Sequence, residues 1–315
     1  MEGRLDTARP KLYKARSTRP FPLTDDKILV AWNGLMISAF ARVGLATSNP
    51  EYVARGARAA DFLLRTMVVG GQLRRVYKDG ESSHLAVLTD HAFFVAALLD
   101  LYEASHEPRW LRSALELQRI QDSGFWDAGA GGYFMSHKDV ADLMTREKKD
   151  YDGAIPAGNS VALQNLLRLE EFTGRESIGK KVEMGLAAFG ATLGRRIVSM
   201  PRMGAALDTY LDQPKEIVIV KPSRESDVRP LLDVLGATYL PSRILVVTTE
   251  GQDLEGLKPL VPLVEGKVAM GGKVTAYVCQ DRVCKRPTSD PRVFGRQLAE
   301  VSPYKGGPFE ALERR

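Results

Sequence analysis

The sequence of 315 residues has very little cysteine and no long apolar segment. Its two cysteines, Cys279 and Cys284, are too few for a disulfide-stabilised scaffold. Their C-x4-C spacing lacks the second pair or nearby histidines of a zinc site and is not the C-x-x-C of a redox centre. No stretch approaches the roughly 20 apolar residues that span a bilayer, and residues 1–17 lack the apolar core of a signal peptide. These absences favour a cytoplasmic protein without membrane contact, metal or cofactor.

A strong bias of charge is also absent, because the formal net charge is only +5. The densest basic cluster, Arg146, Lys148 and Lys149, is interrupted by Glu147 and followed by Asp150. No nucleic-acid-binding motif accompanies this cluster, so the sequence argues against a nucleic-acid partner. The length suits one large domain or two smaller ones with a substantial core.

Residues 25–212 repeat a pairing of an apolar helix with an amphipathic one. We expect apolar helices at about 26–45, 88–105 and 159–172, and amphipathic helices at about 50–67, 108–121 and 178–197. A fourth repeat begins at Met203 and stops at Leu211. Helices that are apolar nearly all round are buried on most sides, so inner helices should contact one another within a layer of outer helices. The pattern predicts a mainly α fold, a partial α/α toroid of about three and a half hairpins.

The periodicity changes after Pro214. Short apolar runs at 216–220, 243–248 and 273–279 predict strands, with helices at 227–236 and 291–301. Strand, helix and strand in succession predict a partly parallel sheet, and the segment after the first strand is not a phosphate loop. The predicted organisation is a lead-in segment at 1–22, the hairpin domain at 23–213, a small α/β unit at 214–302 and a tail at 303–315.

The stretch from Asp25 to Phe40 breaks several local rules. Asn33 and Gly34 stand in the middle of an apolar helix, where each costs up to about 1 kcal/mol relative to Ala. Lys27 carries the unfavourable charge for a helix N-terminus. Such departures inside a buried element indicate a functional or tightly constrained site.

The N-terminal ends of the inner helices should surround one mouth of the toroid, and acidic residues occur at these ends. They are Asp26, Asp90 and, in the loop before the third inner helix, Asp152. Packed helices lie about 8–10 Å apart, so such carboxylates can approach the roughly 5–10 Å that separates glycosidase carboxylate pairs. We therefore predict Asp26 with Asp90 or Asp152 as general acid and base, and Lys27 as the residue that tunes a carboxylate's pKa.

Other residues near these ends could hydrogen-bond sugar hydroxyls or stack on a sugar ring. They are Asp25, Trp32, Asn33, His91, Trp126, Tyr133, Tyr151 and Asn159. Each candidate also has a structural alternative, which the sequence leaves open. The acidic residues and Asn159 are good helix N-caps, His91 can be a buried core histidine, and the aromatic residues can belong to the core.

Taken together, the motifs resemble the spermatogenesis-associated protein 20-like family. The resemblance rests on DDKIL at 25–29 with WNGLMI at 32–37, FWD at 125–127 with GGYF at 131–134, YDGA at 151–154 with GNSV at 158–161, and the segments 214–220 and 277–284. It implies a thioredoxin-like domain followed by a six-hairpin toroid like those of glycosidases and N-acylglucosamine epimerases. This chain resembles the C-terminal part, without the thioredoxin domain and with fewer hairpins, so we expect no thioredoxin-type activity in it.

Two functional hypotheses follow. The first is a carbohydrate-active domain with hydrolase- or epimerase-like chemistry on a sugar or sugar derivative, as the resemblance implies. The second is a non-catalytic interaction module, because an incomplete toroid leaves apolar inner-helix surface uncovered. Under the second hypothesis the chain self-associates or binds a partner chain that carries the missing hairpins.

Overall fold

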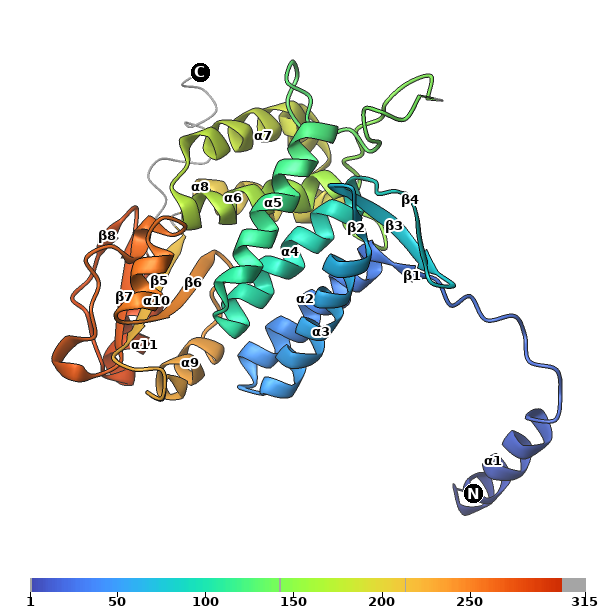
Figure 1. Ribbon diagram of the computed structural model, residues 1–315, viewed down its shortest axis with the longest axis horizontal. Coiled ribbons are helices and arrows are strands. Elements are labelled where there is room, and N and C mark those ends of the chain that lie inside the picture. The colour runs from blue at the N-terminus through green and yellow to red at the C-terminus, as the bar shows by residue number, and fades with distance from the viewer. Residues whose placement is uncertain (1, 142, 213, 302–315) are drawn as a thin grey trace.

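The structure, a computed structural model, describes residues 2–141, 143–212 and 214–301, and consists of helical hairpins followed by a small α/β unit (Figure 1). The inner helices are α2 (Val30–Ala46), α4 (Leu88–Ser105), α6 (Gly158–Thr173) and α8 (Pro201–Leu211). The outer helices are α3 (Pro50–Thr66), α5 (Pro108–Phe125) and α7 (Glu176–Arg196). A short 3-10 helix, η1 (Ile197–Ser199), leads from α7 into α8.

The inner helices pack side by side in chain order, α2 on α4, α4 on α6 and α6 on α8. Helix α4 lies within this row, and its Phe93, Phe94 and Leu98 are fully buried. Outer helices α3, α5 and α7 each pack against the inner helix that precedes them. The predicted partial α/α toroid is therefore confirmed, with four inner helices in the described part of the chain.

The first inner helix begins at Val30, four residues later than the sequence predicted. Ile28–Leu29 form strand β1, which pairs antiparallel with β3 (Gln72–Lys78), so their backbone groups bond across a sheet instead of along a helix. Strand β3 also pairs with β2 (Val68–Val69) and β4 (Glu81–Leu85). This small sheet fixes the direction from which the chain enters α2.

Helix α2 is not buried on most sides, which corrects the sequence-based expectation. Trp32 is 63% exposed, Met36 57% and Val43 46%, whereas Ile37 and Ala41 on the other side of the helix are buried. The reason is position, because α2 is the first helix of the row and packs on α3 and α4 along only part of its circumference. The exposed side of α2 is thus an apolar surface.

The α/β unit contains a sheet in the order β6-β5-β7-β8. Its strands are β5 (Lys215–Lys221), β6 (Arg243–Thr249), β7 (Thr275–Gln280) and β8 (Val283–Cys284). Strands β5 and β6 are parallel and joined through α9, as predicted, while β7 is antiparallel to β5. The other elements are α9 (Arg229–Gly236), α10 (Gln252–Leu257), η2 (Pro262–Val264), η3 (Met270–Gly272) and α11 (Pro291–Ala299).

Alternate residues of β5 face two different cores, as expected for a strand buried on both faces. Ile217 and Ile219 join the cluster that includes Leu231 of α9 and Phe294 of α11. Val218 belongs to the cluster that includes residues of α2, α4 and α6. The hairpins and the α/β unit therefore share one continuous core.

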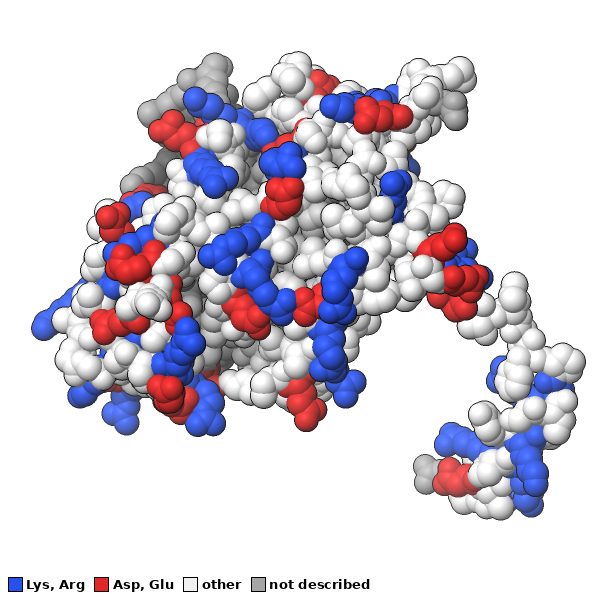
Figure 2. All heavy atoms as spheres, viewed as in Figure 1, with Lys and Arg blue, Asp and Glu red and all other residues white. Residues whose placement is uncertain are grey.

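Helix α1 (Glu2–Arg16) stands away from the body at the end of an extended segment (Figure 1). Figure 2 shows mainly basic side chains on it, whereas acidic and basic side chains are interspersed over the visible face of the body. The predicted tail at 303–315 lies outside the described residues. None of the helices described here has the length and apolar content needed to cross a bilayer.

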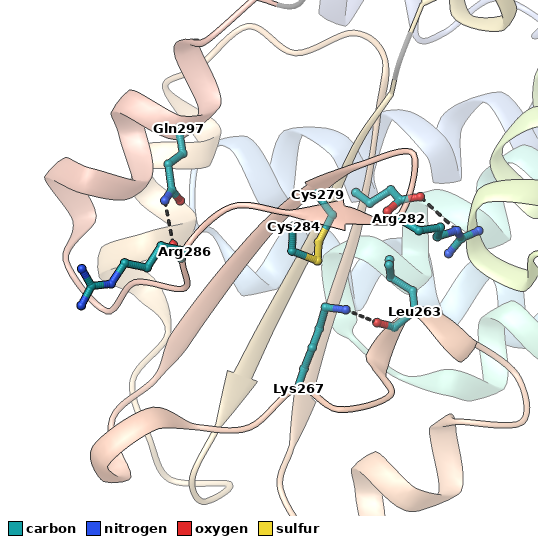
Figure 3. The surroundings of a disulfide bond; sticks show 8 residues. Leu263, Lys267, Cys279, Arg282, Cys284, Arg286 and Gln297 are labelled. Carbon is teal, nitrogen blue, oxygen red and sulfur yellow. Dashed lines mark hydrogen bonds and ion pairs between the residues drawn. A yellow bond between two sulfur atoms is a disulfide. The ribbon is translucent and has the colours of Figure 1, made fainter.

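The two cysteines, to which the sequence assigned no role, form a disulfide across the β7–β8 hairpin (Figure 3). Cys279 is buried in β7 and Cys284 is exposed in β8. The two turn residues, Asp281 and Arg282, both have positive φ (48° and 64°), which suits the tight turn of a two-residue hairpin. Disulfides are more common in oxidising compartments than in the cytosol, so the cytoplasmic location stays a prediction.

Candidate functional site

The acidic motif that precedes α2 lies on the surface. The Asp25 carboxylate is 3.2 Å from Lys27 Nζ, and that of Asp26 is 3.2 Å from Lys78 Nζ on β3. Hydrogen bonding to Lys27 lowers the pKa of Asp25. All four side chains are well exposed, so these ion pairs contribute little stability.

Asp90, the second predicted catalytic carboxylate, is completely buried at the start of α4. It accepts hydrogen bonds from the backbone N–H of Val87 (2.9 Å) and of Ala31 (3.2 Å), and it pairs with Arg75 (3.2 Å). Burial raises the pKa of Asp90, and these three partners lower it in part. One carboxylate thus caps the N-termini of both α4 and α2, which is the capping alternative left open by the sequence.

Asp152, the third predicted carboxylate, also binds backbone N–H groups near helix N-termini. It accepts hydrogen bonds from Arg202 (2.8 Å) and Met203 (3.4 Å) in the first turn of α8, and from Ala157 (2.7 Å) just before α6. Asp26, Asp90 and Asp152 therefore each bind separate partners. No hydrogen bond or ion pair joins any two of them within the described residues.

The polar and glycine residues inside α2 have structural explanations. Asn33 Nδ2 donates to the carbonyl of Leu29 (2.9 Å), the N-cap residue one turn before it. A Cβ on Gly34 would lie 2.8 Å from the backbone carbon of Phe93, so only glycine permits this approach of α2 to α4. The neighbouring Trp32 points into solvent instead of packing in the core.

His91 is a buried histidine with Phe125 beside its ring at a centroid distance of 5.1 Å. Burial lowers the pKa of His91 to about 3, with a smaller contribution from nearby His137. The imidazole is therefore neutral at physiological pH. Its Nδ1 atom has no hydrogen-bond partner among the described residues.

The remaining candidates lie around the loop between α5 and α6. Asn159 clamps Tyr133 through two hydrogen bonds, accepting from its N–H (2.7 Å) and donating to its carbonyl (2.9 Å). Trp126 packs edge-on against the buried Tyr133 ring at 4.9 Å. Tyr151 is exposed and makes none of these contacts. The catalytic and sugar-binding roles assigned to the mouth residues stay predictions, since the observed contacts are those of a scaffold.

A second group of polar residues, which the sequence did not predict, converges from three inner helices and β6. We call Ser38, Asp100, Glu103, Arg168 and Arg243 the inner network. Ser38 of α2 donates to the Asp100 carboxylate on α4, and Arg168 of α6 pairs with Asp100 at 2.8 Å. Arg168 also binds Glu103 (3.0 Å), which in turn binds Arg243 (2.7 Å). These are charges held in the interior of the helical row.

The network contains tightly coupled ion pairs. Burial alone would lower the pKa of Arg168, but the carboxylates of Asp100 and Glu103 more than offset this and raise it above its usual value. The side chains of Asp100 and Glu103 are only 9% and 7% exposed. Such pairs are stable only when their geometry and hydrogen bonding are good, and here each carboxylate has two partners.

Three polar atoms beside the network have no hydrogen-bond partner among the described residues. They are Arg202 Nε on α8 and, on α6, Gln164 Oε1 and Ser160 Oγ. Ser160, Gln164 and Arg168 follow one another at intervals of one helical turn. These three residues therefore share one side of α6. We call the side of α2, α4, α6 and α8 that carries these atoms and the inner network the inner face.

A signal for the inner network was present in the sequence. Ser38 and Asp100 are 62 residues apart, which matches the spacing of the helical repeat, and Arg168 follows at a similar interval. Polar residues at corresponding positions in helices that are otherwise apolar are therefore a sequence signal for Ser38, Asp100 and Arg168, although only the packing of the helices shows that they meet.

The fold and the inner face define a class of protein, a partial α/α toroid with buried polar groups between its inner helices. No protein-family model matches the chain. It is 38% identical over 298 residues to spermatogenesis-associated protein 20 of Mus musculus and 37% identical to that of Homo sapiens, in each case over 91% of this chain. The chain belongs to the spermatogenesis-associated protein 20-like family and spans 38% of the length of these curated relatives.

Solved structures with a similar arrangement share little sequence with the chain. Cellobiose 2-epimerase from Spirochaeta thermophila matches with a TM-score of 0.42 and 19% identity, over 52% of this chain and 43% of that one. At this level of similarity, neither substrate nor activity transfers to the present chain.

Proposed function

We propose that the inner face binds a small carbohydrate derivative and that the chain forms one wall of its site. The observation that carries the proposal is the convergence of Ser38, Asp100 and Arg168 from three different helices, beside the unpartnered Gln164 Oε1. Carboxylate, amide, hydroxyl and guanidinium groups together supply the donors and acceptors that sugar hydroxyls require.

Under this proposal Asp100 is the carboxylate that would exchange a proton with the bound sugar. Arg168 and Ser38 fix its orientation, because they hold its two oxygens from opposite neighbouring helices. A carboxylate positioned in this way can serve as a general acid or base in hydrolase- or epimerase-like chemistry. The mouth carboxylates have other surroundings: Asp90 and Asp152 bind backbone N–H groups at helix N-termini, and Asp26 pairs with an exposed lysine on the surface.

A thermal-melt screen against neutral, N-acetylated and acidic monosaccharides and short oligosaccharides tests the proposal. A ligand that binds only the folded state raises stability by RT ln(1 + [L]/Kd), so millimolar ligand reveals weak binding. We expect one sugar class to raise the melting temperature of the wild-type chain and to have less effect on Ser38→Ala. A cooperative melt that no sugar shifts would contradict the proposal.

The exposed side of α2 supports a second candidate function, an interaction module. Trp32, Met36 and Val43 form an apolar stripe with helical spacing on an inner helix at the end of the row. Exposed apolar stripes of this kind usually mark an interface. We propose that the occupant is another helical hairpin that extends the row, supplied by a partner chain or by a longer form of the protein.

Light scattering tests this second candidate on the chain itself. An uncovered apolar stripe should cause self-association at micromolar concentration, and Met36→Asp on its exposed side should reduce it. Val69→Asp, at an exposed valine of β2, is the matched control, because it removes an exposed apolar side chain outside the stripe. A monomer at all concentrations in the wild type would overturn the interaction module.

A further inference from the structure

The inner face carries more guanidinium groups than its carboxylates neutralise. Arg168 and Arg243 are bound by Asp100 and Glu103, which accounts for both acids. Two further arginines, Arg42 on α2 and Arg202 on α8, are close enough to this cluster to act on each other electrostatically. The inner face therefore holds four arginines and two carboxylates, apart from Asp152 at the start of α8.

Neither Arg42, which is exposed, nor Arg202, which is half-buried, has a hydrogen bond or ion pair from its side chain within the described residues. The Nε atom of Arg202 is buried without a hydrogen bond. The backbone N–H of Arg202 is bound by Asp152, which holds the first turn of α8 in place. Burial lowers the pKa of Arg202, the Arg42 and Arg168 charges lower it further, and the Asp100 and Asp152 carboxylates raise it in part. Buried unpartnered donors are rare in folded proteins and require an explanation.

Bracing of the helices explains only part of the cluster. The inner network of Ser38, Asp100, Glu103, Arg168 and Arg243 is complete by itself, and it already links α2, α4, α6 and β6. Arg42 and Arg202 add positive charge beside this complete network, and the two guanidinium groups repel each other. A bound anion would remove this repulsion and would give Arg202 its missing acceptor.

We propose that Arg202, together with Arg42, binds the anionic group of a carboxylated or phosphorylated sugar on the inner face. The arrangement suits such a ligand because a guanidinium binds both kinds of oxyanion through paired hydrogen bonds. Gln164 Oε1, unpartnered on neighbouring α6, is then available to accept a hydrogen bond from a sugar hydroxyl. The inference rests on the proposed function in one respect, that the organic part of the ligand is a sugar.

Calorimetric titration of the full chain tests the inference with glucuronate, glucose 6-phosphate, glucose and inorganic phosphate as probes. We expect at least one acidic sugar to bind ten-fold or more tightly than glucose, and phosphate to compete with it. Arg202→Gln should weaken binding of that acidic sugar at least ten-fold while leaving its affinity for glucose unchanged. Arg55→Gln, at an exposed arginine of outer helix α3, is the matched control and should bind like the wild type.

A second variant and the melting temperatures of the unliganded proteins distinguish a lost contact with the ligand from misfolding of the Arg202→Gln variant. Arg202→Lys keeps the charge but loses the paired donors, so its affinity should fall between those of the wild type and Arg202→Gln. Unliganded Arg202→Gln should melt at or above the wild-type temperature, because the repulsion with Arg42 is removed.

The possible outcomes separate the two proposals. Equal binding of glucose and the acidic sugars, or an Arg202→Gln variant that binds them like the wild type, would overturn the anion site and leave the proposed sugar site standing. Binding of phosphate through Arg202 without binding of any sugar would support the anion site and contradict the proposed function. Absence of binding by all four probes would overturn the anion site, and the thermal-melt screen of the wider set of sugars would then decide the proposed function.

Discussion

At the scale of single residues, Asp90 lies at a helix N-terminus as the sequence predicted, but its contacts are those of a cap and not those of the predicted catalytic carboxylate. The sequence located acidic residues at the N-terminal ends of inner helices, and the structure has them there. The Asp90 carboxylate, however, faces Val87 and Ala31 N–H groups and Arg75 instead of solvent. Negative charge at a helix N-terminus suits capping and catalysis alike, and the hydrogen bonds of Asp90 to two backbone N–H groups favour capping.

Replacement of Asp90 by Ala should therefore lower the stability of the chain strongly. The change leaves two backbone donors and Arg75 without their acceptor, so we expect a loss of about 3 kcal/mol in the free energy of unfolding. Urea unfolding measures it. The control is Asp26→Asn, which breaks only an exposed ion pair and should change stability by less than about 1 kcal/mol. Equal losses in the two variants would refute the capping role.

Glu171 makes the stability of the chain depend on pH. Burial, with the adjacent Glu216 carboxyl, raises the pKa of Glu171 to about 8. The folded state therefore holds a proton that the unfolded state releases near pH 4.5, the usual value for glutamate. The stability that this proton contributes is fully present below that pH and is lost as the pH rises through 8. His91 and His106, with folded-state pKa values of about 3 and 4, bind protons only in the unfolded state below about pH 6.5, so their opposite effect on stability fades above pH 7.

We expect the free energy of unfolding to fall between pH 6.5 and 8 by up to about 1.4 kcal/mol per pH unit. Denaturant titrations at several pH values measure the slope. Glu171→Gln should abolish most of it, whereas Glu81→Gln, at an exposed site on β4, should retain it. A wild-type stability that is constant across this range would show that Glu171 is ionised in the folded chain.

At the scale of elements, the contact of α2 with α4 depends on Gly34. Gly34→Ala would raise helix propensity by about 1 kcal/mol, but its Cβ would meet the Phe93 backbone at 2.8 Å. We expect the clash to prevail, with a net loss of about 1–3 kcal/mol in thermal or urea unfolding. Gly190→Ala, in α7 with no atom within 4 Å of the added Cβ, should instead stabilise the chain. Stabilisation by both substitutions would disprove the close contact.

The β7–β8 hairpin depends on its disulfide, because β8 has only two residues. Its turn residue Arg282 reaches Glu216 of β5 at 3.2 Å and the carbonyl of Glu171 on α6 at 2.9 Å. Reduction should lower the free energy of unfolding by about 2 kcal/mol, the value for a short closed loop. Melting curves with and without a thiol reductant measure this. The variant carrying both Cys279→Ala and Cys284→Ala should not respond to reductant, and a wild type that behaves in the same way would contradict the role of the bond.

At the scale of the whole molecule, helical periodicity predicted the inner and outer helices because burial repeats every turn. The β5–α9–β6 unit was also predictable from its pattern of apolar residues, because two short apolar runs flank an amphipathic segment. The start of α2 and the exposure of Trp32 were not predictable, because they depend on pairing with β3 and on the helix's place at the end of the row. Likewise, the inner face arises from residues far apart in the sequence, and only the packing of α2, α4, α6 and α8 brings them together.

We infer that the ligand site lies on the inner face and not at the acidic motif before α2. The most direct test is the melting temperature of the chain titrated with the sugar that binds best, for the wild type, Asp100→Asn and Asp26→Asn. We expect the sugar to raise the melting temperature of the wild type and Asp26→Asn, and to leave that of Asp100→Asn unchanged. A rise that is lost in Asp26→Asn and kept in Asp100→Asn would contradict the account and place the site at the mouth.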